Sequence, residues 1–198
     1  MQNVFGKPFN AETEFARNGC QFDRLLVDDD CFQMGGLHAQ AIHTPGHTPA
    51  CMTYMITDHS IDPVRTFAFV GDTLFTPDYG TAPCDFLGGD AHTLYRPTQK
   101  VLALSDSTEF YLCRDYPAAG NRAPECRTTV ATQKSANVYV HEGVDEESFV
   151  AKREARDVTL AMPELIFPSV QVNVRGGLLP PPEDNGIRYL NKIPVGAL

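Results

Sequence analysis

Two strand-like segments each lead into a loop that carries a side chain able to bind a metal ion, and this pairing most constrains the fold. Residues 37–42 run into the loop His43-Thr-Pro-Gly-His47, and the Phe- and Val-rich run 66–70 leads through a glycine to Asp72. Proline excludes a helix through the first loop, and a carboxylate after an apolar strand is costly unless it is paired or metal-bound. Because ligand sites of mixed helix–strand proteins lie in loops at strand ends, the pattern predicts an α/β fold with a site there.

The remaining pattern alternates short strands with amphipathic helices. Further strands are predicted at 31–34, 50–56 and 109–113, and helices at 90–104, 124–134 and 145–162. Asp90 is the expected N-cap of the first helix, and in the last helix Arg153 is expected on the solvated face and Val158 inward. This order predicts a layered α/β fold of the α+β type. We expect residues 1–198 to form a single domain on which the Pro- and Gly-rich segment 163–198 packs as an extended tail.

Composition excludes several classes of partner. The formal net charge of −9 disfavours a nucleic-acid backbone or an anionic membrane, and no run approaches the roughly 18 apolar residues of a membrane span. The six cysteines form no Cys-x-x-Cys pair, which predicts reduced thiols in a reducing compartment. We therefore expect a cytoplasmic protein, or a mitochondrial one if the source is eukaryotic. The sequence leaves homo-oligomerisation open.

His47 and Asp72 are the candidate metal ligands. One imidazole and one carboxylate suit iron(II), zinc or manganese, but two ligands do not hold such an ion well. Within the chain the candidates for a third ligand are His43, His92 and His141. Taken singly, each histidine is more often a surface or hydrogen-bonded structural residue, and Asp72 alone is more often a turn or N-cap aspartate.

Three motifs resemble those of a known superfamily. His43-Thr-Pro-Gly-His47-Thr-Pro-Ala, the block Gly-Asp72-Thr-Leu-Phe and the block Cys113-Arg-Asp-Tyr116 are similar to the second, third and last motifs of the metallo-β-lactamase superfamily. The segments 78–86, 168–176 and 179–186 resemble the persulfide dioxygenase (sulfur dioxygenase) branch. The resemblance extends over nearly the whole chain, and the downstream segments are the ones that indicate the branch.

The resemblance implies an αββα sandwich and a site with one Fe(II) ion, with Zn as the alternative metal. His47 and Asp72 occupy the positions of two of its three ligands. It implies that Tyr116 lies near the metal as a catalytic residue, and that Asp85 and Arg175 bind substrate. The opening motif of the superfamily, His-x-His-x-Asp-His, is not in the sequence, so we expect the sandwich to be incomplete on its N-terminal side.

The function implied by the resemblance is oxidation of glutathione persulfide, or a related glutathione-linked thiol, to sulfite and glutathione. Two positions depart from the pattern: Arg114 stands where the superfamily has a histidine for a second metal, and Pro83 where this branch has an arginine. The alternatives are a glyoxalase II-like metal-dependent thioester hydrolase, and a non-catalytic remnant or interaction protein. Because the opening motif is absent, whether this chain is itself an enzyme is left open.

Overall fold

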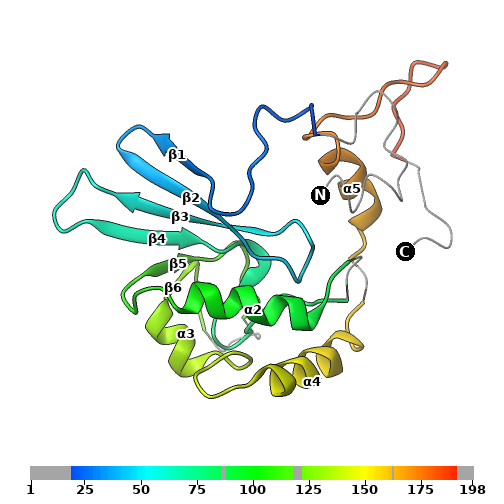
Figure 1. The fold of residues 1–198 in the computed structure, drawn as a ribbon. Helices are drawn as coiled ribbons and strands as arrows, with labels where there is room; N and C mark the ends of the chain where they lie inside the picture. Colours follow the sequence, from blue (N-terminus) through cyan, green and yellow to red (C-terminus); the bar gives the residue numbers. More distant parts are fainter. Residues whose placement is uncertain (1–18, 86–87, 118–121, 162, 191–198) are drawn as a thin grey trace. The chain divides into compact units, whose positions relative to one another are not determined.

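The computed structural model divides the chain into two compact units (Figure 1). It describes residues 19–85, 88–117, 122–161 and 163–190. One unit, Leu26–Thr159, contains the sheet and three helices, and the other joins Met1–Leu25 to Leu160–Leu198. In the described ranges no helix combines the length and the apolar character needed to cross a membrane. That residues 1–198 form a single domain stays a prediction.

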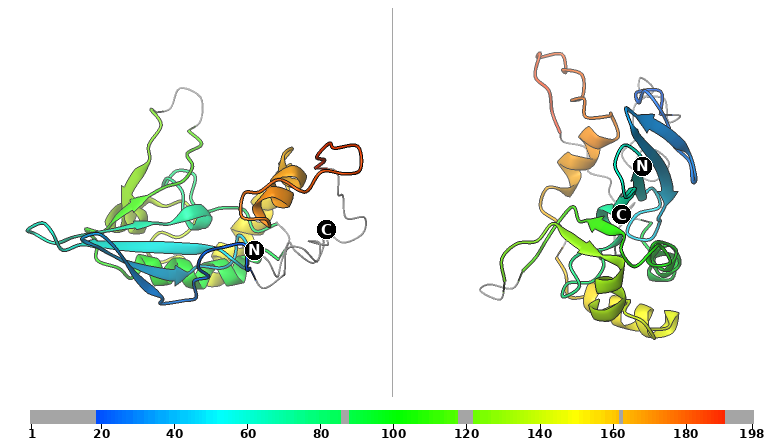
Figure 2. Two further views of the ribbon diagram at one scale, coloured as in Figure 1. Left: turned by 90° about the horizontal axis from the view of Figure 1, so that it is seen from above. Right: turned by 90° about the vertical axis from the view of Figure 1, so that its left-hand side faces the viewer.

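The sheet has six strands in sequence order, from β1 to β6 (Figures 1 and 2). Their bounds are β1 Cys31–Met34, β2 Leu37–His43, β3 Met52–Asp58, β4 Arg65–Phe69, β5 Glu109–Tyr111 and β6 Arg127–Thr129. Neighbouring strands are antiparallel except for the parallel pair β4–β5. That pair is parallel because the long connection from β4 to β5 includes a helix, which lets β5 run in the same direction. Sequence and structure agree on the first four strands to within two residues.

Helix α2, Ala91–Leu102, begins where the sequence predicts. The Asp90 carboxylate accepts the Thr93 amide hydrogen bond at 2.6 Å, which satisfies one of the free N–H groups of the first turn. Leu94 and Val101 lie on the buried face, about two turns apart along the same stripe. Helix α2 therefore follows from local sequence alone.

The segment 124–134, predicted as one helix, is divided between a strand and a helix. Residues of β6 pair with β5, and α3 (Val130–Ala136) begins only afterwards, with Thr129 as its N-cap. The β-branched pair Thr128 and Thr129 suits the sheet edge, and their pairing with Glu109 and Phe110 outweighs local helix propensity. The helix prediction was therefore wrong for residues 124–129.

The last two helices also differ from the predictions. Helix α4, Glu146–Asp157, starts after the N-cap Asp145 but ends five residues before the predicted end at 162. Val158, expected to point inward, is 86% exposed, whereas Arg153, expected in solvent, is 2% exposed. Helix α5, Ile166–Asn173, lies in the segment predicted to be extended. Its proline is in the first turn, where a missing N–H breaks no helical hydrogen bond.

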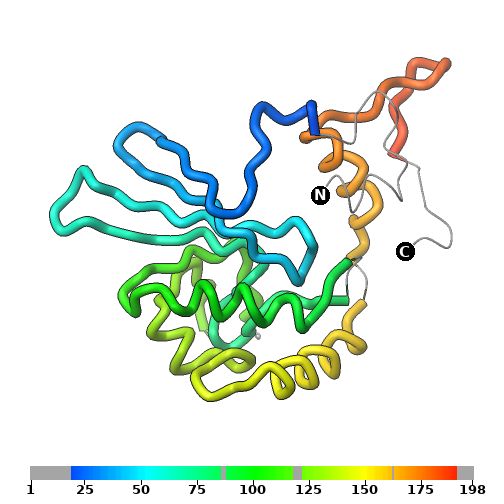
Figure 3. Tube along the Cα trace, in the orientation of Figure 1, coloured from blue at the N-terminus to red at the C-terminus, as the bar shows by residue number. Residues whose placement is uncertain are grey.

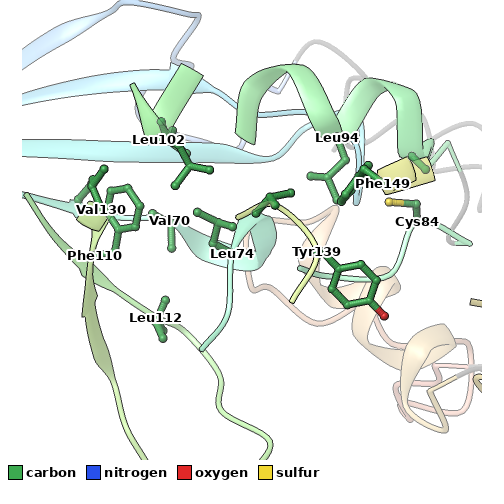
Figure 4. Close-up of a cluster of buried hydrophobic side chains, with 14 of the residues drawn as sticks. Val70, Leu74, Cys84, Leu94, Leu102, Phe110, Leu112, Val130, Tyr139 and Phe149 are labelled. Atoms are coloured by element: carbon green, nitrogen blue, oxygen red, sulfur yellow. The ribbon is translucent and has the colours of Figure 1, made fainter. Parts of the chain in front are cut away.

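The hydrophobic core lies between the sheet and helices α2, α3 and α4. Ala68 of β4 and Phe110 of β5 are fully buried on the covered face of the sheet. Val130 of α3 and Phe149 of α4 are also fully buried and belong to the same cluster. Figure 4 shows this cluster continuing from Phe110 and Val130 to Phe149. Val70 and Leu74 also belong to this core, so the segment that leaves the end of β4 is packed into it.

Candidate metal centre

The loop after β2 is held against the first turn of α2 through Gly46. The Gly46 carbonyl accepts the Asp90 amide hydrogen bond at 2.8 Å. The φ angle of Gly46 is +138°, and a Cβ atom there would lie 2.3 Å from the Cα atom of Leu94. Only glycine fits a backbone conformation and a helix contact of this kind. The loop that carries His47 is therefore fixed in place by α2.

His47 is hydrogen-bonded to the main chain through a ring nitrogen. Nδ1 lies 2.6 Å from the carbonyl oxygen of Pro83. Because a carbonyl only accepts, Nδ1 carries the proton and donates, so Nε2 is the ring nitrogen with metal-binding character. Metal-binding histidines ordinarily donate their other ring N–H to a carbonyl or carboxylate in this way. This hydrogen bond fits a metal-binding role for His47, which stays a prediction.

Asp72 lies in η1, Gly71–Thr73, directly beyond β4, with its side chain 24% exposed. Its Oδ1 atom lies 3.3 Å from Nε of Arg114 and accepts a hydrogen bond from Sγ of Cys113 at 3.4 Å. Desolvation, and then the Asp72 carboxylate, raise the pKa of the Cys113 thiol to about 11, so the thiol stays protonated as a donor. The charge of Asp72 is therefore compensated by a guanidinium within the chain.

The segment from β4 to α2, traced in Figure 3, is anchored by α3. Gln133 donates from Nε2 to the Phe75 carbonyl at 2.8 Å, and Asn137 donates from Nδ2 to the Gly80 carbonyl at 3.2 Å. Both amide side chains are fully buried. Since buried main-chain carbonyls need partners, these amides determine the path of the loop just beyond Asp72.

Arg122 links the same segment to the loop after β5. Its guanidinium binds both carboxylate oxygens of Asp115 at 2.6 Å and also contacts Asp78 at 2.8 Å. The Arg122 hydrogen bonds hold the pKa of the Asp115 carboxyl far below its usual range. A bidentate pair of this kind fixes geometry as well as charge. The sequence did not predict that Arg122 and Asp115 form an ion pair, because no local pattern marks them as partners.

Tyr116 lies beside the Asp72 neighbourhood. Its ring is 4.7 Å from that of Tyr79 and 5.7 Å from that of Phe75, measured between centroids. Its hydroxyl accepts a hydrogen bond from Nη1 of Arg114 at 3.5 Å, the same guanidinium that pairs with Asp72. Tyr116 is 44% exposed, so it can meet a ligand from solvent. The structure thus brings Tyr116, Arg114 and Asp72 together.

The two predicted substrate-binding residues lie in different units. Asp85 is exposed, two residues beyond the Pro83 carbonyl that binds His47. Arg175 belongs to the other unit, where it is 2% exposed and donates from Nη1 to the Gln171 carbonyl at 2.6 Å. A role for either in binding substrate stays a prediction.

The donor chemistry of His47 and Asp72 fits a metal ion, but the described residues do not complete its site. Among them, no group of three or more histidine, cysteine, aspartate or glutamate side chains is placed to hold a metal. The three candidates for a third ligand each use a ring nitrogen elsewhere: His43 with the Pro49 carbonyl, His92 with Glu146, and His141 with the Glu142 carbonyl.

The chain is similar over most or all of its length to several known proteins. The chain is 58% identical over its whole length to a probable metallo-hydrolase of Burkholderia pseudomallei, of which it covers 67%. It is 44% identical to glyoxylase B2 of Dictyostelium discoideum, covering 65% of that protein. It is 30% identical over 83% of its length to the mitochondrial persulfide dioxygenase ETHE1 of Bos taurus, covering 58% of it. No family model matches the chain.

Solved structures have the same fold. ETHE1 from Myxococcus xanthus superimposes with a TM-score of 0.64 and 29% identity, over 77% of this chain and 60% of that one. A metallo-β-lactamase from Staphylococcus aureus gives a TM-score of 0.59 at 19% identity, over 78% of this chain and 44% of that one, which indicates the fold alone. The predicted mixed α/β fold of the metallo-β-lactamase type is confirmed.

Proposed function

The chain belongs to a family of metallo-hydrolases with the metallo-β-lactamase fold, and we propose that His47 and Asp72 are two of the protein ligands of one divalent metal ion. The observation that carries the proposal is the 2.6 Å hydrogen bond from Nδ1 of His47 to the Pro83 carbonyl. It orients the ring and leaves Nε2 as the ligating nitrogen. Asp72, at the end of the neighbouring strand β4, supplies the carboxylate.

Arg114 supports a single ion rather than two. Its guanidinium is always protonated and lies 3.3 Å from Oδ1 of Asp72. An oxygen engaged by this cation is a poor bridge to a second metal, and a second cation beside it would be repelled. The superfamily resemblance puts a second-site histidine at this position, so the replacement favours one-metal chemistry.

Within this site we propose iron-dependent oxidation of glutathione persulfide. The resemblance to the persulfide dioxygenase of Bos taurus supports it. A ferrous ion would supply dioxygen activation and a binding position for the persulfide sulfur. The Tyr116 hydroxyl, which accepts a hydrogen bond from Nη1 of Arg114 at 3.5 Å, would hydrogen-bond a bound ligand. The exposed Asp85 carboxylate would bind the glutathione amino group.

A second candidate is hydrolysis of a glutathione thioester. It is favoured by the 44% identity to glyoxylase B2, which exceeds the 30% identity to the persulfide dioxygenase. This chemistry would use zinc in the same place to polarise a carbonyl. The two candidates differ in their requirement for dioxygen, which makes them separable by one pair of assays.

Metal binding is tested first. The purified chain is loaded anaerobically with iron(II) and, separately, with zinc, and bound metal is measured by elemental analysis. We expect Asp72→Ala and His47→Gln each to abolish stoichiometric binding. His59→Gln is the control, because His59 lies in the turn after β3, at the opposite end of that strand from the loop that carries His47. Equal metal content in Asp72→Ala and the unaltered chain would remove Asp72 from the site.

Activity then separates the candidates. The iron-loaded protein should consume dioxygen only after glutathione persulfide is added, and should release sulfite. Turnover of S-lactoylglutathione without dioxygen consumption would instead support the thioester hydrolase. A chain that binds neither metal would contradict both candidates and leave the non-catalytic alternative.

A further inference from the structure

Helix α4 carries an ion pair that is almost completely buried. Nη2 of Arg153 lies 2.6 Å from Oδ1 of Asp157, and the two side chains are 3% and 7% exposed. The guanidinium also lies 4.7 Å from the centroid of the Tyr139 ring. Desolvation makes a buried ion pair no more stabilising than well-packed apolar side chains of similar volume. Stability alone therefore does not account for the pair, and what it contacts is informative.

Both partners hold the main chain on either side of Pro83. Arg153 donates from Nη1 to the Thr81 carbonyl at 3.1 Å, and Asp157 accepts the Cys84 amide hydrogen bond through Oδ2 at 2.8 Å. The residues between these two anchor points include Pro83, whose carbonyl accepts the hydrogen bond from His47. The three interactions form one connected path from α4 to the imidazole.

Pro83 itself has few ways to hold its carbonyl in place. Proline has no N–H, and its ring makes no polar contact, so the direction of the carbonyl depends on the peptides before and after it. Asp157 binds the N–H of the Pro83–Cys84 peptide, which is the peptide that carries this carbonyl. Arg153 binds the Thr81 carbonyl, two residues before Pro83. The segment is also buried, with Thr81 and Ala82 at 0% exposure, so water does not substitute for these anchors.

We propose that Arg153 and Asp157 are positioning residues that orient His47 through the main chain of residues 81–84. The role in metal binding rests on the proposed function, whereas the role in holding the imidazole does not. Outer groups that orient a metal-binding histidine ordinarily change metal affinity when they are removed. Neither Arg153 nor Asp157 contacts substrate in this assignment.

The test uses a double variant, Arg153→Met with Asp157→Leu. Apolar replacement of both partners avoids leaving one buried charge unpaired, which would destabilise the fold. Asp157→Asn is the second variant: it removes the charge that pairs with Arg153, but it keeps the side-chain shape and a weaker acceptor for the Cys84 amide. Val130→Ala is the control, because this substitution lowers stability without altering the path to His47. Val130 is fully buried in the core, and its backbone N–H bonds the Thr108 carbonyl rather than residues 81–84.

The principal readout is the His47 ring in the metal-free protein, followed by ¹⁵N–¹H NMR of labelled histidines at a pH where the imidazole is neutral. His47→Gln identifies the signal. The unaltered chain should show one tautomer, with the proton on Nδ1. The double variant should show both tautomers, Asp157→Asn an intermediate state, and Val130→Ala the unaltered signal. Metal affinity of the double variant should fall by about 10-fold, as for other outer-shell losses.

Two outcomes would overturn the proposal. One is an unchanged His47 signal in a folded double variant, or in Asp157→Asn if the double variant does not fold. The other is an equal change in Val130→Ala, which would make the effect a general loss of stability. The spectrum is recorded without metal, so it tests the positioning of His47 independently of metal binding. A chain that binds no metal would contradict the proposed function but would leave this test intact.

Discussion

Replacing Gly46 by alanine tests how tightly the His47 loop is held against α2. In this substitution the new Cβ atom would lie 2.3 Å from Cα, 2.4 Å from Cβ and 2.5 Å from N of Leu94. These are mostly backbone atoms of a helix, so no side-chain rotation relieves the overlap. The φ angle of +138° adds strain, because residues other than glycine rarely adopt it.

The expected loss combines three contributions. An alanine at such a backbone angle costs about 1–3 kcal/mol. Moving the loop away from α2 weakens the hydrogen bond from Asp90 to the Gly46 carbonyl, which contributes about 1 kcal/mol. Displacing α2 disturbs the packing of Leu94, and overpacking of a core ordinarily costs about 1–3 kcal/mol. Gly46→Ala should therefore lower the free energy of unfolding by about 5 kcal/mol, the middle of the summed range. This is a large part of the roughly 5–15 kcal/mol of a typical domain.

Equilibrium urea unfolding measures this loss, with far-UV circular dichroism as the probe because the chain has no tryptophan. Gly35→Ala is the matched control: Gly35 also has a positive φ, +60°, but a Cβ atom there meets nothing within 4 Å. It should cost only about 1 kcal/mol, the penalty for a left-handed residue. If the two variants lose the same stability, the close contact between loop and helix does not exist as described.

Two further predictions concern ionisable groups. Asp115→Asn should lower the free energy of unfolding at neutral pH by about 3 kcal/mol, because it breaks the pair between Arg122 and a carboxylate that is 8% exposed. The folded-state pKa of Asp115 lies below its unfolded value, so this stabilisation is present above the unfolded pKa and is lost as pH falls through the folded pKa. If the urea stabilities of the unaltered chain and of Asp115→Asn fall in parallel on acidification, the prediction is contradicted. Burial, followed by the nearby Asp157 carboxylate, raises the pKa of the Cys84 thiol to about 12, so a disulfide reagent should modify the exposed Cys126 in the native protein and reach Cys84 only in denaturant. Equal rates at the two cysteines, measured by mass spectrometry, would show that Cys84 is not buried.

Local pattern was sufficient for much of the fold. Strands β1 and β2 were predicted on either side of Gly35-Gly36, and α2 because Asp90 precedes an apolar stripe with helical spacing. In each case the hydrogen bonds that define the element join residues close in the chain. The loop positions of His47 and Asp72 were predicted for the same reason, although their role as ligands stays a prediction.

Other features depended on partners far away in the sequence. Residues 127–129 form a strand because β5 offers an edge, although their own surroundings favour a helix. Helix α4 ends at Asp157 rather than at 162, and the helical pattern alone placed Arg153 in solvent. Its burial follows from Asp157 and from the Thr81 carbonyl, 72 residues earlier.

The sequence by itself determined the strand and helix pattern of residues 31–104 and the two loops that hold the candidate ligands, because these depend on hydrophobic period, turn residues and caps within a few positions. Only the tertiary structure decided how His47 is oriented, which cation compensates Asp72, and which buried polar side chains hold residues 73–85. Those outcomes depend on hydrogen bonds and ion pairs between segments 36 to 73 residues apart, and the free energy of such contacts has no local signature in the chain.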